Sequence, residues 1–199
     1  MKVINQTLLE KVIIERSRSS HKGDYGRLLL LGGTYPYGGA LTILARTSLS
    51  FPSSQLILTP HQKEWEKLSG ITIEKQKEDA TASVLPSFPQ GTILVEKGPA
   101  TRIWEVGQSD YYQLQVGGPY QATGGMGDTL AGMIAGFVGQ FRQASLYERV
   151  AVATHLHSAI AQELSQENYV VLPTEISRYL PKIMKIICQQ ERVSKDKLV

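Results

Sequence analysis

Residues 121–137 read QATGGMGDTLAGMIAGF, a glycine-rich turn that leads directly into a helix with many small residues. In such a turn, successive backbone N–H groups can point into one concavity, and the N-terminal end of the helix adds its positive dipole. The turn therefore predicts an anion-binding site. Asp128, expected as the first residue of the helix, is either a simple helix cap or a base that takes a proton from a hydroxyl attacking a bound phosphate, and spacing alone leaves both open.

Three apolar runs upstream of this turn are typical of buried strands: RLLLLGG at 27–33, QLILT at 55–59 and TILVEKG at 92–98. Each ends in a loop with polar or small residues, namely TYPYGGA, TPHQKE and KGPAT. In an open α/β sheet, ligands bind outside the carboxyl ends of the strands. We therefore expect the three loops to meet at one edge of a mainly parallel sheet.

The remaining segments predict helices and one hairpin. RIWEV and DYYQLQV alternate in polarity around a Gly-containing turn, which favours an antiparallel hairpin. His155 and His157 lie in an apolar helical run and are expected to be packed histidines rather than ligands. Helices are expected at 5–16, from residue 40 to 50, at 61–68, 74–85, 128–141, 145–166 and 174–190.

Composition favours one soluble, core-forming domain over residues 1–199, because 42% of the residues are hydrophobic and 20% are charged. The net charge of +3 suits anionic small molecules and does not imply nucleic acid. The lone Cys188 indicates neither disulfides nor a Cys-rich metal site and fits a reducing cytoplasm. We expect neither a signal peptide nor a membrane anchor, since no apolar run approaches roughly 18 residues.

Four motifs occur in the order GRLLLLGGTYPYGGA, ILTPHQKEWEKLSG, ILVEKGPATRIW and TGGMGDTLAGMIAG. In kind and order they resemble the ADP-dependent NAD(P)H-hydrate dehydratases of the ribokinase-like superfamily. The resemblance implies a three-layer α/β fold with a mainly parallel central sheet flanked by helices. It also implies an enzyme that uses ADP to phosphorylate the hydroxyl of hydrated NADH or NADPH, after which phosphate leaves and AMP and the reduced coenzyme remain.

The resemblance assigns roles to individual residues. Asp128 is the implied catalytic base and a substrate contact, and Ala40 and His61 are implied contacts of the hydrated nicotinamide nucleotide. His61 could instead cap the following helix, and Lys97 could be an ordinary surface residue at a strand end. The implied nucleotide-binding residues are Lys97, Gly98, Pro99, Ala100, Thr101, Gly124, Gly125 and Gly127. Mg²⁺ is an expected companion of ADP with unknown protein ligands, and a cytoplasmic homo-oligomer, a tetramer, is expected.

The sequence departs from the family pattern in one large way. Only residues 41–59 separate TYPYGGA from the TPH motif, whereas the family has several further strands and helices between them. We expect a missing segment at a splice point near 38–41, so that the single domain is shortened between residues 40 and 59. Either the chain is truly short, which would expose sheet edges and leave an incomplete pocket, or a segment of a longer protein is absent from this sequence. We favour the second, because a deletion through a parallel sheet should be strongly destabilising.

Two smaller departures concern the site loops. TPHQKE lacks the Pro-Gly that follows His in the family, and GGPYQ replaces Asn-Pro-Gly-Met ahead of the glycine-rich turn. Two other functions stay open at this point. One is a small-molecule kinase of the same superfamily, and the other is a non-catalytic nucleotide-binding module, which the apparent internal loss favours.

Overall fold

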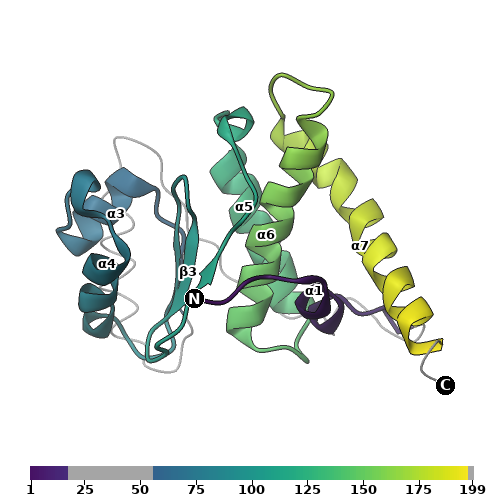
Figure 1. Ribbon diagram of the computed structural model, residues 1–199, viewed down its shortest axis with the longest axis horizontal. Coiled ribbons are helices and arrows are strands. Elements are labelled where there is room, and N and C mark those ends of the chain that lie inside the picture. The colour runs from purple at the N-terminus through teal and green to yellow at the C-terminus, as the bar shows by residue number, and fades with distance from the viewer. Residues whose placement is uncertain (18–55, 197–199) are drawn as a thin grey trace. The chain divides into compact units, whose positions relative to one another are not determined.

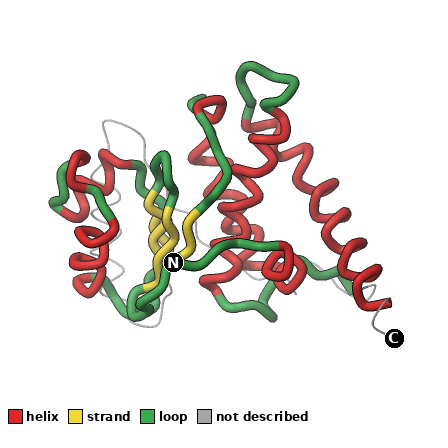
Figure 2. The backbone as a smooth tube through the Cα atoms, in the orientation of Figure 1, coloured by secondary structure: helices red, strands yellow, loops and turns green. Residues whose placement is uncertain are grey.

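The computed structural model describes residues 1–17 and 56–196 (Figures 1 and 2). Within these ranges the chain forms two compact units, residues 1–2 with 56–113 and residues 3–17 with 114–196. We describe each unit by itself. The predicted strand at 27–33, the predicted helix at 40–50, the junction at 38–41 and the implied substrate contact Ala40 lie outside the described residues.

The first unit contains a four-stranded sheet in the order β1-β2-β3-β4. β1 and β2 are parallel, while β2–β3 and β3–β4 are antiparallel, which confirms the predicted hairpin. The described sheet is therefore mixed rather than mainly parallel. The physical reason is the short turn between β2 and β3, since a parallel crossover needs about a dozen residues or more. The strands are β1 (Ile57–Leu58), β2 (Ile93–Glu96), β3 (Arg102–Glu105) and β4 (Tyr112–Gln113).

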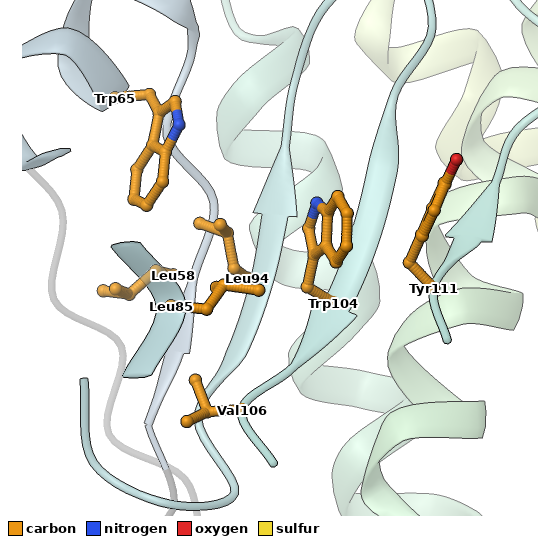
Figure 3. Packing of buried hydrophobic residues seen from close by; sticks show 7 residues of the cluster. All are labelled: Leu58, Trp65, Leu85, Leu94, Trp104, Val106 and Tyr111. Atoms are coloured by element: carbon orange, nitrogen blue, oxygen red, sulfur yellow. The ribbon is translucent and has the colours of Figure 1, made fainter. Parts of the chain in front are cut away.

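Helices cover one face of this sheet (Figure 1). Trp65 of α3 is fully buried against the strands, and Trp104 stacks on Tyr111 with ring centroids 4.2 Å apart. Figure 3 shows these rings with the aliphatic side chains of the same cluster, which consists of Leu58, Trp65, Leu85, Leu94, Trp104, Val106 and Tyr111. The covering elements are α3 (Gln62–Ser69), the 3₁₀ turns Ile73–Lys75 and Leu85–Ser87, and α4 (Glu78–Val84).

The second unit is helical, and α6 packs against α1, α5 and α7. These helices confirm the predicted ones, with ends that shift by a few residues. His157 is buried as predicted, and burial lowers the pKa of His155. Among the described residues no helix has the length and apolar character to cross a membrane. The elements are α1 (Gln6–Val12), a 3₁₀ turn at Pro119–Gln121, α5 (Met126–Gln140), α6 (Leu146–Leu164) and α7 (Pro173–Asp196).

Candidate active site

The glycine-rich turn of the second unit ends at Gly125, the N-cap of α5. Its φ of +86° lies in the left-handed region, which favours glycine. A Cβ at this position would lie only 3.3 Å from Cγ of Pro173. Both the backbone conformation and the close approach of α7 therefore require glycine here.

The first turn of α5 presents backbone N–H groups of the kind that bind anions. Gly125 has no side chain with which to cap the helix, and helix geometry leaves the first N–H groups without acceptors in the helix. The amides of Gly127 and Asp128 belong to this turn, and the Asp128 side chain is exposed. A Cβ built on Gly124 meets no described atom within 4 Å. Backbone donors, an acidic side chain and open space thus coincide at one helix end.

The turn is held in place by contacts that sequence reasoning missed. The Thr123 hydroxyl donates to the carbonyl of Val171 (3.1 Å), and the Val171 amide donates to the carbonyl of Tyr120 (3.1 Å). Gln121 Oε1 accepts from the Gly118 amide (3.3 Å), and its Nε2 lies 3.5 Å from the Ser158 hydroxyl on α6. These contacts tie the turn and the segment before it to α6 and to Val171, two residues before α7.

The second group of predicted residues lies in the first unit, where residues 97–101 connect β2 to β3. The Thr101 hydroxyl donates to the Gly98 carbonyl (3.1 Å) and accepts from the Gly98 amide (3.4 Å), which closes the turn on itself. The Lys97 amide donates to the Pro60 carbonyl (3.0 Å), so the turn lies beside the segment that begins α3. The structure thus brings the predicted residues 97–101 and His61 into one region of this unit.

A cavity of about 330 Å³ opens beside this turn, a volume at the small end of ligand pockets. Its lining includes two lysines and the Glu96–Arg102 ion pair described next. The lining residues are Gln62, Gln76, Lys77, Glu96, Lys97, Gly98, Pro99, Ala100 and Arg102.

Glu96, the last residue of β2, is a buried carboxylate that is 5% exposed. It accepts hydrogen bonds from Arg102 Nη2 (2.8 Å) and Nε (3.1 Å), from the Thr81 hydroxyl (3.0 Å) and from Trp104 Nε1 (3.1 Å). Arg102 Nη2 also donates to the Gln76 carbonyl (3.2 Å). Sequence reasoning missed this network, although opposite charges at both ends of EKGPATR were a usable signal.

His61 is the N-cap of α3. Its Nδ1 accepts from the amides of Lys63 and Glu64, each at 3.2 Å, while the Glu64 carboxylate accepts from the His61 amide at 2.8 Å. Because Nδ1 is an acceptor, the neutral ring carries its proton on Nε2. The capping role considered from the sequence is thus the one the structure shows, and the contact of His61 with a substrate stays a prediction.

No group of three or more His, Cys, Asp or Glu side chains within residues 1–17 and 56–196 could hold a metal ion. Asp128 is the single carboxylate in the turn from Thr123 to Asp128. Mg²⁺ keeps several waters and often binds through one or two carboxylates plus substrate phosphates. These residues therefore fit a Mg²⁺ ion that arrives with a nucleotide, and they do not form a protein cage for one.

The comparisons with known proteins agree on one family. The sequence pattern of NAD(P)H-hydrate dehydratase matches residues 28–182. The ADP-dependent (S)-NAD(P)H-hydrate dehydratase of Streptococcus pneumoniae is 66% identical over 290 positions, and the match covers 100% of both chains. The alignment of the two chains is 290 positions long, 91 more than the 199 residues of this chain.

Two solved structures are similar in fold. A ribokinase-like superfamily protein from Enterococcus faecalis superimposes with a TM-score of 0.77 at 27% identity, over 94% of this chain and 96% of that one. The ADP/ATP-dependent NAD(P)H-hydrate dehydratase of Bacillus subtilis, co-crystallised with ATP and Mg²⁺, gives a TM-score of 0.60 at 30% identity, over 67% of this chain and 49% of that one. Together with the matched sequence pattern, these similarities show that the chain has a ribokinase-like α/β fold and belongs to the NAD(P)H-hydrate dehydratase family.

Proposed function

We propose that this chain dehydrates the S form of hydrated NADH or NADPH at the expense of ADP. The substrate hydroxyl attacks the terminal phosphorus of ADP, and AMP is the leaving group. The phosphorylated carbon then loses phosphate, which carries away the former hydroxyl oxygen, and a ring proton leaves to restore NADH or NADPH. The glycine-rich turn with Asp128 in the first turn of α5 is the single observation that carries this proposal.

Asp128 acts as the base in this proposal. It is the third residue of α5, it is exposed, and it lies in the first helical turn, whose backbone N–H groups can donate hydrogen bonds to a phosphate that is being transferred. A carboxylate repels a ground-state phosphate but can take the proton of a hydroxyl that attacks it. The amides of Gly125 and Gly127 would offset negative charge on the phosphate during the transfer.

The nucleotide is assigned to two groups of residues. The turn from Lys97 to Thr101 would bind the AMP portion, and Gly124, Gly125 and Gly127 would bind the transferring phosphate. The closed turn, the lysine and the neighbouring cavity support the first assignment, and the uncapped helix end supports the second. Ala40 and His61 remain the proposed contacts of the hydrated nicotinamide nucleotide. When bound, Mg²⁺ would neutralise phosphate charge.

We further propose that the chain is a cytoplasmic homo-oligomer, a tetramer, that binds neither nucleic acid nor membranes. A single cysteine supports the cellular location, and the modest net charge argues against a nucleic-acid partner. The oligomeric state rests on family likeness. Sedimentation of the full chain would test it.

The length of the chain also leads to a proposal. The comparison with the S. pneumoniae relative covers both chains from end to end, yet includes 91 positions more than this chain has residues. We place this difference inside a single ribokinase-like domain, between residues 40 and 59. The same observation favours a second candidate function, a module that binds AMP or ADP without turnover. Names of the relatives favour the dehydratase over a small-molecule kinase.

Replacement of one carboxylate tests the proposed base. Asp128→Asn keeps the size of the side chain and removes its basicity, so kcat should fall by about 10²–10⁴ while the Kd of AMP stays the same. Asp79→Asn is the matched control, because Asp79 is also exposed and lies in the first turn of α4. Turnover by Asp128→Asn close to that of the control would rule out Asp128 as the base.

A further inference from the structure

The ion pair between Glu96 and Arg102 lies at the two ends of the 97–101 turn. The two residues are paired across β2 and β3, and Arg102 Nε and Nη2 donate to both carboxylate oxygens. Their side chains are 6% and 14% exposed, so water screens the pair only weakly. A buried ion pair with two hydrogen bonds therefore joins the last residue of β2, before the turn, to the first residue of β3, after it.

We propose that Glu96 and Arg102 are positioning residues for the nucleotide. Their ion pair fixes the conformation of the 97–101 turn, and Arg102 cancels the negative charge of Glu96 beside the cavity next to that turn. This inference rests on the proposed function, since it takes the turn to be part of the AMP site. Neither residue is assigned a part in the reaction itself.

The first half of the inference concerns geometry. Arg102 Nη2 donates to the Gln76 carbonyl, and Gln76 Nε2 donates to the carbonyl of Gln62 (2.8 Å). Gln62, Gln76 and Arg102 all line the cavity beside the turn. One guanidinium thus links the end of the turn to Gln76 and, through Gln76, to Gln62, so that three lining residues of the cavity are held together.

The second half concerns charge. Glu96 and Arg102 both contribute to the cavity wall, as do Lys77 and Lys97. With the pair intact, the charges of Glu96 and Arg102 offset each other, so the pair adds no net charge to the cavity wall. Without Arg102, an uncompensated carboxylate would remain in the wall of a site for a phosphate-bearing ligand, and like charges in a partly buried site repel strongly.

Four variants separate these effects. Arg102→Gln removes the positive charge and should raise the KM for ADP about tenfold to a hundredfold, with kcat within about threefold of the parent. Arg102→Lys restores the charge without the two-pronged geometry and should recover part of the loss. The double variant Glu96→Gln with Arg102→Gln leaves no unpaired charge and should recover more than Arg102→Gln alone.

Trp104→Phe is the matched control, because it removes one donor to the same carboxylate and leaves the Glu96–Arg102 pair intact. It should lower the temperature of unfolding without changing the KM for ADP. An equal change of KM in Trp104→Phe and Arg102→Gln, or no recovery in the double variant, would overturn the inference.

Calorimetric titration with AMP separates this inference from the proposed function. If the parent chain binds AMP without turnover, the dehydratase proposal fails, and a tenfold weaker Kd in Arg102→Gln still supports the positioning role. If the parent turns over and Arg102→Gln keeps the parental Kd and KM, the positioning role fails alone. A parent chain that binds no AMP contradicts both.

Discussion

Gly125→Ala probes the backbone on which the proposed phosphate site depends. Gly125 has a φ of +86°, and an added Cβ would come within 3.3 Å of Cγ of Pro173. The left-handed conformation costs a non-glycine residue about 1–2 kcal/mol, and the close contact with α7 requires a further shift. We therefore expect a loss of about 1–3 kcal/mol in the free energy of unfolding.

Gly124→Ala is the matched control in the neighbouring position. Its φ lies outside the left-handed range, and a Cβ there meets no described atom within 4 Å. A compatible Gly-to-Ala change is neutral or stabilises by up to about 1 kcal/mol, because it restricts the unfolded chain. Gly125→Ala should thus lose stability, while Gly124→Ala should keep or gain it.

Thermal and urea unfolding, followed by circular dichroism, measure the difference. For a chain of this size each kcal/mol corresponds to about 2–4 °C in Tm, so Gly125→Ala should melt about 2–12 °C below the parent. It should also raise the KM for ADP, because a shifted first turn of α5 no longer aims its amides at the phosphate. Equal melting temperatures for Gly124→Ala and Gly125→Ala would refute the reasoning.

Two further predictions concern stability. Burial raises the pKa of Glu148, but hydrogen bonds from Lys11 and Ser145 outweigh burial and hold that pKa below its ordinary value. The ionised Glu148 carboxylate therefore stabilises the folded state at pH values above its unfolded-state pKa, and this stabilisation is lost as the pH falls through its folded-state pKa. Lys11→Met should cost about 0.2–1 kcal/mol at neutral pH and nothing in strong acid, and urea unfolding that shows the same cost at both pH values would contradict this. Trp65→Ala should cost about 3–5 kcal/mol, since Trp65 is fully buried in the core cluster, and a loss below 1 kcal/mol by urea unfolding would be inconsistent with that packing.

The sequence predicted best the elements whose signals are local. The long apolar stripe predicted a helix at 145–166, and the structure has α6 at Leu146–Leu164. The glycine-rich turn predicted the start of a helix at Asp128, two residues after α5 begins at Met126. Caps and periodicity act within one or two turns of chain, so a single sequence displays them directly.

Features that depend on distant contacts were predicted less well. The single helical piece expected at 74–85 is interrupted at Gln76, whose side chain donates to the carbonyls of Gln62 and Ile71. The last helix was expected to end at 190 and runs to Asp196. At Gln76 the hydrogen bonds to other segments override local helix preference, and no helical periodicity announces them.

In the candidate site, too, features with a local sequence signal were predicted and contacts between segments were missed. Gly125 and Asp128 were identified because a motif carries them, and the structure gives physical reasons for their positions. The pairing of Glu96 with Arg102 was missed: the opposite charges at the ends of EKGPATR were a signal, but only the register of β2 and β3 shows that the two side chains meet. The junction near residue 40 lies outside the described residues, so the proposed internal shortening is best tested by the intact mass of the protein.

The most direct test of the proposed reaction is its stoichiometry. Protein of verified mass is incubated with ADP and the S form of hydrated NADH, and NADH, AMP and phosphate are measured together. We expect the three products in equal amounts, with none formed when ADP is omitted. Binding of AMP without formation of NADH would contradict the proposal and leave a nucleotide-binding module as the function of this chain.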